Sequence, residues 1–281
     1  MGLKAALILR IAKRWISGVD LESALKDAKN ANDRGMGAII NFLGEEITDQ
    51  GTADSQAEEY LKLQQGLSDR KIRGFVSVKL TQFGLAADEG RAVARLGKVA
   101  ENAQRLGQLV WIDMEGSAVE EQTVRIYLDA HSRHPNLGVA LQAYHRKSEA
   151  DLKAILDGGG RVRLVKGAYR EGKDVVFGAK REVSENFRRL MTMLFERGEG
   201  FAIGTHDSRL VDEARRLAES KHTDFEFEML KGIRNELKGE LVKSGYKVSE
   251  YLPYGDKWFD YSQRRMTEHP SNIWLLIRSL V

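Results

Sequence analysis

The sequence predicts an α/β fold, a (β/α)8 barrel of the TIM type, and three observations lead to this prediction. The length of 281 residues and the 42% hydrophobic content suit one barrel domain with a sizeable core. Eight short runs rich in β-branched and apolar residues recur along the chain. Helix-like segments separate these runs, as in a chain of alternating strands and helices. We therefore expect a single domain over 1–281, with extra helices in 1–36 and the barrel in 37–281.

The predicted strands follow from local composition, and the helices from their periodicity and end signals. The strands are expected at 37–44, 74–80, 108–115, 137–144, 161–169, 201–206, 225–230 and 247–254. The segments 88–107 and 208–220 read as helices, the second with Asp207 or Ser208 as its N-cap. The glycine-rich run 157–161 indicates the end of a helix before the fifth strand, because it lacks the strand and helix context of a dinucleotide-binding loop.

Composition excludes several classes of function. The 44 basic and 41 acidic residues leave a net charge of +3 that is spread along the chain, so nothing indicates a nucleic-acid partner. Cysteine is absent, which excludes disulfides, thiol nucleophiles and cysteine-ligated metals and fits a reducing compartment. No run approaches the roughly 20 apolar residues of a membrane span. We therefore expect a cytoplasmic protein, peripheral on the membrane at most.

Two apolar segments leave alternatives open. Residues 1–20 alternate cations with apolar side chains, which suits ordinary packing or a helix lying on a membrane surface. Residues 272–280 form an apolar helical stripe that would pack in the core, against a membrane or against another subunit of an oligomer. His131 and His134 have a spacing compatible with a metal, but no third ligand lies nearby in the sequence, so we expect a surface pair and no metal.

Polar side chains gather where the predicted strands end. Active sites of this fold lie at the carboxyl ends of the strands, so these residues are candidates for one common site. They are Asn41, Glu45, Lys79, Asp113, Glu115, Gln142, Arg163, Lys166, Tyr169, Thr205, His206, Glu226, Glu228 and Tyr251.

The run YSQRRMTEHP at 261–270 places two arginines side by side near the end of the sequence. Neighbouring residues of a helix point about 100° apart, so Arg264 and Arg265 suit the gripping of one anion from two sides. Tyr261 and Glu268 lie three or four residues away and would share one stripe with them.

Several fragments, at matching strand ends, resemble the FAD-dependent proline dehydrogenase family. They are SVKLTQFG, WIDME, LQAY, RLVKGAYRE, GTHD, FEFEMLKGIR and YLPYGDKWFDYSQRRMTEHPSN, and the likeness runs from about residue 37 to the end. The resemblance implies a distorted barrel whose last helix lies over the barrel mouth. It also implies the monofunctional bacterial and archaeal type, since no aldehyde dehydrogenase or DNA-binding module accompanies the barrel.

The activity implied by the resemblance is the first step of proline catabolism. L-proline would be oxidised to Δ1-pyrroline-5-carboxylate by hydride transfer to FAD, and the electrons would pass to a quinone. Since a quinone is lipid-soluble, contact with the membrane would be transient and peripheral. A hydroxyproline dehydrogenase is the alternative within flavin enzymes, because one added hydroxyl is hard to read from the walls of a pocket.

The resemblance also assigns roles to residues. Arg163 would lie near flavin N5, and Asp113 would take a substrate proton or hold Lys79. Lys79, Arg264 and Arg265 would bind the substrate carboxylate, with Leu164, Tyr169 and Tyr251 around the proline ring. Glu45 and Glu268 could pair with the arginines as a charged gate when no substrate is bound. The expected FAD contacts are Met114, Gln142, Arg163, Lys166, Gly167, Ala168, Thr205, His206 and Glu228.

Two residues depart from the family pattern, and two lysines have other interpretations. The family commonly has Asp at the position of Asn41 and Gln at that of Glu228, so an extra carboxylate would lie near the cofactor. Lys79 and Lys166 could instead be structural lysines paired with carboxylates such as Asp113. They could also indicate a Schiff-base aldolase, in which a lysine attacks a carbonyl.

Overall fold

The structure is a computed structural model in which residues 12, 14–221, 224–259 and 261 are described. The strands are β1 (Gly37–Phe42), β2 (Gly74–Val78), β3 (Val110–Ile112), β4 (Leu137–Gln142), β5 (Val162–Val165), β6 (Phe201–Gly204), β7 (Phe225–Leu230) and β8 (Lys247–Tyr254). The helices are α2 (Leu21–Asp33), α3 (Gln50–Asp69), α4 (Glu89–Arg105), α5 (Ser117–His131), α6 (Ser148–Asp157), α7 (Lys180–Arg197), α8 (Ser208–Lys221) and α9 (Asn235–Lys243), with a 3-10 turn η1 (Leu80–Phe83) after β2.

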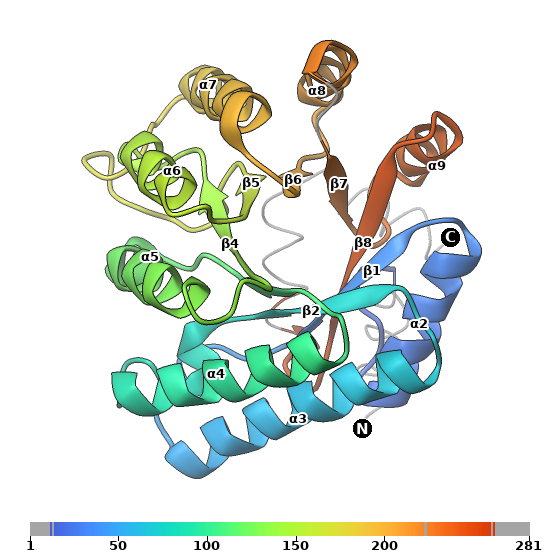
Figure 1. The fold of residues 1–281 in the computed structure, drawn as a ribbon, viewed down its shortest axis with the longest axis vertical. Helices are drawn as coiled ribbons and strands as arrows, with labels where there is room; N and C mark the ends of the chain where they lie inside the picture. Colours follow the sequence, from blue (N-terminus) through green and yellow to red (C-terminus); the bar gives the residue numbers. More distant parts are fainter. Residues whose placement is uncertain (1–11, 13, 222–223, 260, 262–281) are drawn as a thin grey trace.

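The strands form one closed parallel barrel in the order β1 to β8, and β8 pairs with β1 to close it. Helices surround the strands, as Figure 1 shows. The predicted (β/α)8 fold is therefore confirmed, and every predicted strand contains an observed one. The strands end earlier than predicted at several places because the polar residues that follow, such as Lys79 and Asp113, already belong to the loops of the mouth.

Successive side chains of a strand point to opposite faces, and this alternation divides the apolar residues into two groups. The larger cluster lies between the strands and the helices. A smaller cluster inside the barrel contains Ile39, Trp111 and Ala202. A Cβ atom on Gly138 would lie 2.3 Å from the Trp111 ring, so only glycine leaves room for this indole. Trp111 thereby fills part of the barrel interior.

The helix predicted before the first strand is present as α2, which packs against β1 and β8. Asp20 caps it, because its carboxylate accepts a hydrogen bond of 2.8 Å from the Ser23 amide. The glycine-rich run also behaves as predicted: α6 ends at Asp157, and Gly159 adopts a φ of +67°.

Described residues before α2 meet described residues after β8 beside the carboxyl ends of β1 and β8. Trp15 and Ile16 form an apolar cluster with Leu43, Trp258 and Tyr261. The expected course of the last helix over the mouth depends on residues 262–281, which lie outside the described residues, and so do Arg264, Arg265 and Glu268.

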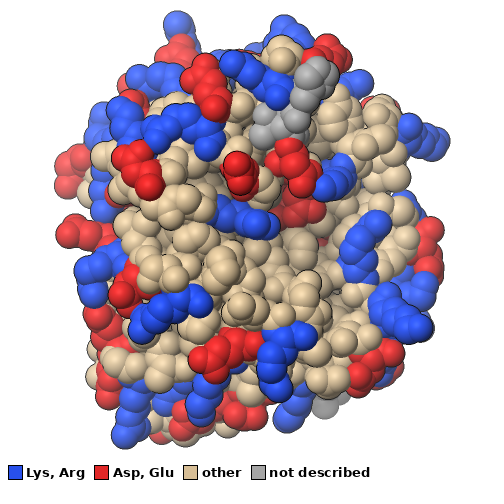
Figure 2. Space-filling model, in the orientation of Figure 1, with Lys and Arg blue, Asp and Glu red and all other residues tan. Residues whose placement is uncertain are grey.

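The surface shown in Figure 2 carries lysine and arginine side chains interspersed with aspartate and glutamate. This pattern agrees with a net charge of only +3. Within the described part of the chain, no helix is long and apolar enough to cross a bilayer.

Candidate active site

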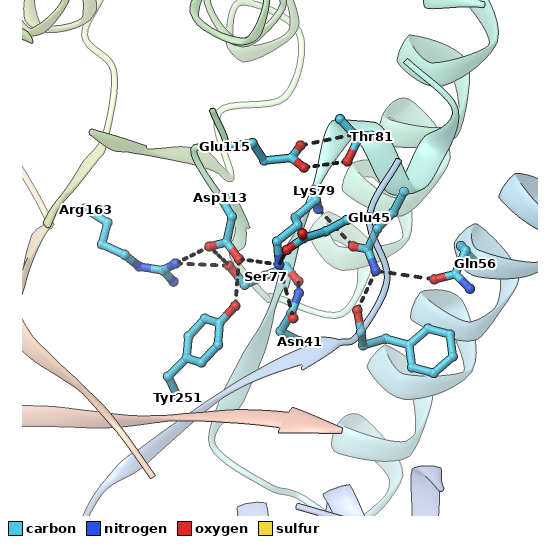
Figure 3. A network of polar contacts seen from close by, with 12 residues as sticks. Asn41, Glu45, Gln56, Ser77, Lys79, Thr81, Asp113, Glu115, Arg163 and Tyr251 are labelled. Carbon is cyan, nitrogen blue, oxygen red and sulfur yellow. Dashed lines mark hydrogen bonds and ion pairs between the residues drawn. The ribbon is translucent and has the colours of Figure 1, made fainter. Parts of the chain in front are cut away.

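The Asp113 carboxylate is the centre of a polar network at the carboxyl end of the barrel (Figure 3). Its Oδ1 atom accepts hydrogen bonds from Ser77 Oγ at 2.6 Å and from Arg163 Nη1 at 2.8 Å. Its Oδ2 atom accepts one from the Tyr251 hydroxyl at 2.6 Å, and Lys79 Nζ lies 3.6 Å away. These partners belong to β2, β5, β8 and the residue after β2, so only the closed barrel brings them together.

The charges of this network fix the protonation of its members. Burial favours the neutral form of Asp113, but the Lys79 and Arg163 cations outweigh burial and keep its pKa below the ordinary value. Burial and the nearby carboxylate raise the pKa of Tyr251 well above its ordinary value. Asp113 is therefore an ionised acceptor at neutral pH, and Tyr251 is a neutral donor.

Lys79 lies at the mouth with its ammonium group between two carboxylates. Its side chain is 10% exposed, and Nζ lies 3.6 Å from Asp113 and 3.8 Å from Glu45. Asn41 Oδ1 is 3.5 Å from the same nitrogen. Glu45 was expected to pair with Arg264 and Arg265; within the described chain it forms an ion pair with Lys79.

Hydrogen bonds to neighbouring groups fix the side-chain amide of Asn41. Its Nδ2 atom donates to the Ser77 carbonyl at 2.8 Å and contacts the Tyr60 hydroxyl at 3.2 Å. Tyr60 in turn donates to Gln82 at 2.9 Å. A neutral side chain thus occupies the position beside Lys79.

Arg163 is buried in the barrel between two carboxylates. One side of its guanidinium contacts Asp113, and Nε forms an ion pair with Glu228. The guanidinium lies 4.8 Å above the Trp111 ring. Its Nη2 atom is buried and has no hydrogen-bond acceptor among the residues that the structure describes. Such a buried donor is the kind of group that a bound ligand satisfies.

The expected cofactor residues of β4 and β5 are linked to each other. Gln142 donates to the Glu115 carbonyl at 2.9 Å and accepts from the Ala168 amide at 3.3 Å. Gly167 has a φ of +112°, and a Cβ atom there would lie 2.2 Å from the Tyr144 ring. Gly167 is therefore required by both its backbone conformation and its close packing.

The loop after β6 carries the next group of expected cofactor residues. Lys166 and Asp207 form an ion pair at 2.7 Å. Thr205 Oγ1 accepts from the Asp207 amide at 3.2 Å, and His206 Nε2 accepts from the Leu230 amide at 3.0 Å. These bonds join the carboxyl ends of β5, β6 and β7 into one rim.

The remaining expected residues are placed as follows. Met114 is buried beside the rim, and Tyr169 is half-buried in the loop after β5. Leu164 follows Arg163 on β5, so the two side chains point to opposite faces of the strand. Leu164 belongs to the cluster between strands and helices. The expected role of Leu164 as a wall of the substrate pocket stays a prediction.

Two functional residues were missed from the sequence. Ser77 is fully buried and hydrogen-bonded to Asp113, and Arg163 also contacts it at 3.0 Å. Ser77 is two residues from both Phe75 and Lys79 and therefore shares their face of the strand. This alternation was the signal that could have found it. Tyr60 lies on α3, and no local signal connects it to the site. No group of three or more metal-ligating side chains occurs in the part of the chain that is described.

Comparison with known proteins agrees with this geometry. Residues 24–273 match the family model described as proline dehydrogenase. Proline dehydrogenase 1 of Bacillus subtilis subsp. natto is 35% identical over 273 residues, covering 96% of this chain and 90% of that protein. Proline dehydrogenase of Deinococcus radiodurans is 30% identical over 279 residues, covering 96% and 90%.

A solved structure shows the same fold. The crystal structure of proline utilization A from Bdellovibrio bacteriovorus, inactivated by N-propargylglycine, aligns with a TM-score of 0.86 and 24% identity. The alignment covers 92% of this chain and 32% of that one. Together with the family match over most of its length, the strand-end network shows that this chain belongs to the proline dehydrogenase family.

Proposed function

We propose that this protein oxidises L-proline to Δ1-pyrroline-5-carboxylate with FAD as its cofactor. The observation that carries the proposal is the arrangement of Lys79 and Arg163 around one ionised carboxylate, Asp113, at the mouth of a barrel of this family. The matched relatives are named proline dehydrogenases, which supports the substrate.

The residues at the mouth fit a flavin. The Arg163 Nη2 donor is buried and lacks an acceptor in the described chain, and Lys166 stands half-exposed at the rim. Gln142 fixes the backbone of the loop through the Ala168 amide. FAD, when bound, would accept the hydride from the proline ring carbon next to nitrogen. Arg163 would place a positive charge next to the flavin, and the rim residues, with Met114, Thr205 and His206, would hold the cofactor.

Lys79 would bind the proline carboxylate together with Arg264 and Arg265. Charge-assisted hydrogen bonds of this kind stabilise a complex by about 1.5–3 kcal/mol each and fix the orientation of the ligand. Tyr169 and Tyr251 would cover the apolar part of the ring. Glu45, which pairs with Lys79, would release it when substrate enters, and Glu268 would act likewise on the arginines.

Asp113 would act as an organiser and not as a general base. A carboxylate whose pKa lies below its ordinary value is a weak proton acceptor at neutral pH. Three hydrogen bonds and Lys79 already engage both of its oxygens. Its role is to hold Lys79 and Arg163 in position for substrate and cofactor.

The ion pairs of Lys79 do not favour a Schiff-base aldolase, since a nucleophilic lysine needs an uncharged amine in a desolvated pocket.

The electrons would pass to a quinone, and the protein would meet it by peripheral contact at the cytoplasmic side of the membrane. Hydroxyproline would be tested as a competing substrate in the same assay.

The test begins with the purified protein, which should contain a flavin and bleach on anaerobic addition of L-proline. Arg264→Ala and Arg265→Ala should each raise the KM for proline by about ten- to a hundredfold, as the loss of one charge-assisted bond requires, while the flavin stays bound. Absence of a flavin, or an unchanged KM in both variants, would contradict the proposal.

A further inference from the structure

Two glutamates of β7 point into the barrel, and one of them, Glu228, forms an ion pair with Arg163. Glu226 and Glu228 are two residues apart on one strand, so their side chains share the inner face. Glu228 is only 4% exposed. Gly204 of β6 stands opposite Glu228 in the strand register, and Arg163 reaches from β5 to the Glu228 carboxylate.

The charges around Glu228 do not balance if every carboxyl is ionised. Arg163 already holds Asp113 on its other side. Glu226 brings a further carboxyl, whose Oε2 atom accepts a hydrogen bond of 2.8 Å from Ser249 of β8. The guanidinium of Arg163 would then be shared by two carboxylates, with the third beside them.

Within the described residues, the cations that form ion pairs with Asp113 and Glu228 are Arg163 and Lys79. Lys79 stands on the far side of Asp113 and is also paired with Glu45. Lys247, next to Glu226 in the strand register, pairs with Asp224 at an exposed position. The inward residues of β6 are uncharged, and β8 contributes the Ser249 and Tyr251 hydroxyls. Buried carboxyls with too few cations keep a proton instead of ionising together.

The directions of two pKa shifts agree with this geometry. Burial raises the pKa of Glu228 well above its ordinary value; Arg163 opposes the rise, and the neighbouring Glu226 adds to it. Asp113, in contrast, has a lowered pKa because Lys79 and Arg163 outweigh its burial. The proton therefore belongs with Glu228 and not with Asp113.

We propose that Glu228 keeps its proton at neutral pH, so that Arg163 has Asp113 as its fully ionised partner and keeps positive charge available at the mouth. Glu228 is in this view a positioning residue that sets the charge beside the cofactor. The consequence for the flavin rests on the function proposed above. The proton on Glu228 itself does not, because it is a property of the folded chain.

Loss of this proton at alkaline pH would add one negative charge next to Arg163. The added charge would oppose electron uptake by a bound flavin, so its reduction potential would fall more steeply with pH than it otherwise does. Glu228→Gln keeps the shape of the side chain. It reproduces the uncharged state of protonated Glu228 without the proton that can be lost.

The first experiment measures the unfolding equilibrium of the protein against pH, without proline. A group whose pKa is raised on folding binds more protons in the native state, so stability is lost as pH rises from the ordinary glutamate value through the raised one. The unfolding constant of the wild type should rise by up to tenfold per pH unit more than that of Glu228→Gln. Glu185→Gln, on the exposed side of α7, should keep the pH dependence of the wild type.

Two spectroscopic measurements complete the test. The infrared spectrum of the wild type at neutral pH should contain the carbonyl band of a buried protonated carboxyl, and this band should vanish in Glu228→Gln. The flavin potentials of the two proteins should coincide at neutral pH and diverge as pH rises, with the wild type lower.

Equal pH slopes of unfolding in wild type and Glu228→Gln, with no carboxyl band, would overturn the proton on Glu228. A potential that differs by a constant amount at every pH would mean that Glu228 is always ionised and would overturn it too. A wild type that holds the proton but fails to oxidise proline would contradict only the proposed function.

Discussion

The hydroxyl of Tyr251 offers a sharp test of the Asp113 network, because a single atom can be removed from it. In Tyr251→Phe the ring stays and continues to cover Arg163, whose guanidinium lies 5.7 Å from the ring centre. The hydrogen bond of 2.6 Å to Asp113 Oδ2 disappears. Asp113 keeps its bonds from Ser77 and Arg163 and its ion pair with Lys79.

The magnitude follows from the number of partners that remain. A hydrogen bond to a charged group contributes about 1.5–3 kcal/mol, and three other partners of Asp113 compensate in part. We therefore expect a loss near the lower figure, about 1.5 kcal/mol, in the free energy of unfolding. If Asp113 positions Lys79 for substrate, kcat/KM for proline should fall by roughly tenfold.

The assay is dye-linked oxidation of L-proline with kcat and KM resolved, combined with urea unfolding. Tyr246→Phe is the matched control, since its ring packs on Phe225 and Phe227 outside the site. The Tyr251 bond lowers the pKa of Asp113, so its loss should move the acid limb of stability to higher pH. Equal changes in stability, kcat/KM and acid limb for the two variants would refute the reasoning.

Three further predictions use the same protein and assays. Lys79→Met should raise the KM for proline by about ten- to a hundredfold while retaining the flavin; loss of flavin would assign Lys79 to the cofactor instead. Asp113 has a lowered pKa, so its stabilisation is present above the ordinary value and lost as pH falls through the folded one; Asp113→Asn should remove this acid limb in pH-dependent unfolding. Gly167→Ala should lower Tm and flavin content, because its Cβ atom would strike Tyr144 at 2.2 Å; Gly178→Ala, with open space around it, should change neither.

The fold could be predicted because each strand carries its own local signal. Runs such as 37–42 and 74–78 are rich in Ile, Val and Phe, and the helices between the strands have caps and an apolar stripe. The polar residues after the strands predicted the location of the site, since all parallel strands of a barrel end at one face. Asp113, Lys79, Arg163 and Tyr251 accordingly lie in one network.

The partners within the site could not be predicted in the same way. Which side chain meets Arg163 depends on the register and closure of the barrel, which place Glu228 across Gly204. The face to which Leu164 points could not be predicted, because a short strand gives no sign of which residue starts the inward alternation. The pairing of Glu45 with Lys79 depends on the path of a loop, which local sequence does not determine.

The position of Trp111 explains how this barrel can hold so many charges inside. Burial of aliphatic side chains between strands and helices supplies the main stabilisation, at about 25 cal/mol per Å² of apolar surface removed from water. The barrel interior next to the Trp111 indole can therefore hold charged side chains instead of apolar ones. Because the Arg163 guanidinium rests 4.8 Å above the Trp111 ring, the aromatic face stabilises the cation from the side that no carboxylate occupies. Replacing Trp111 by leucine would remove this support and open a cavity under the network, so stability and the position of Arg163 should change together.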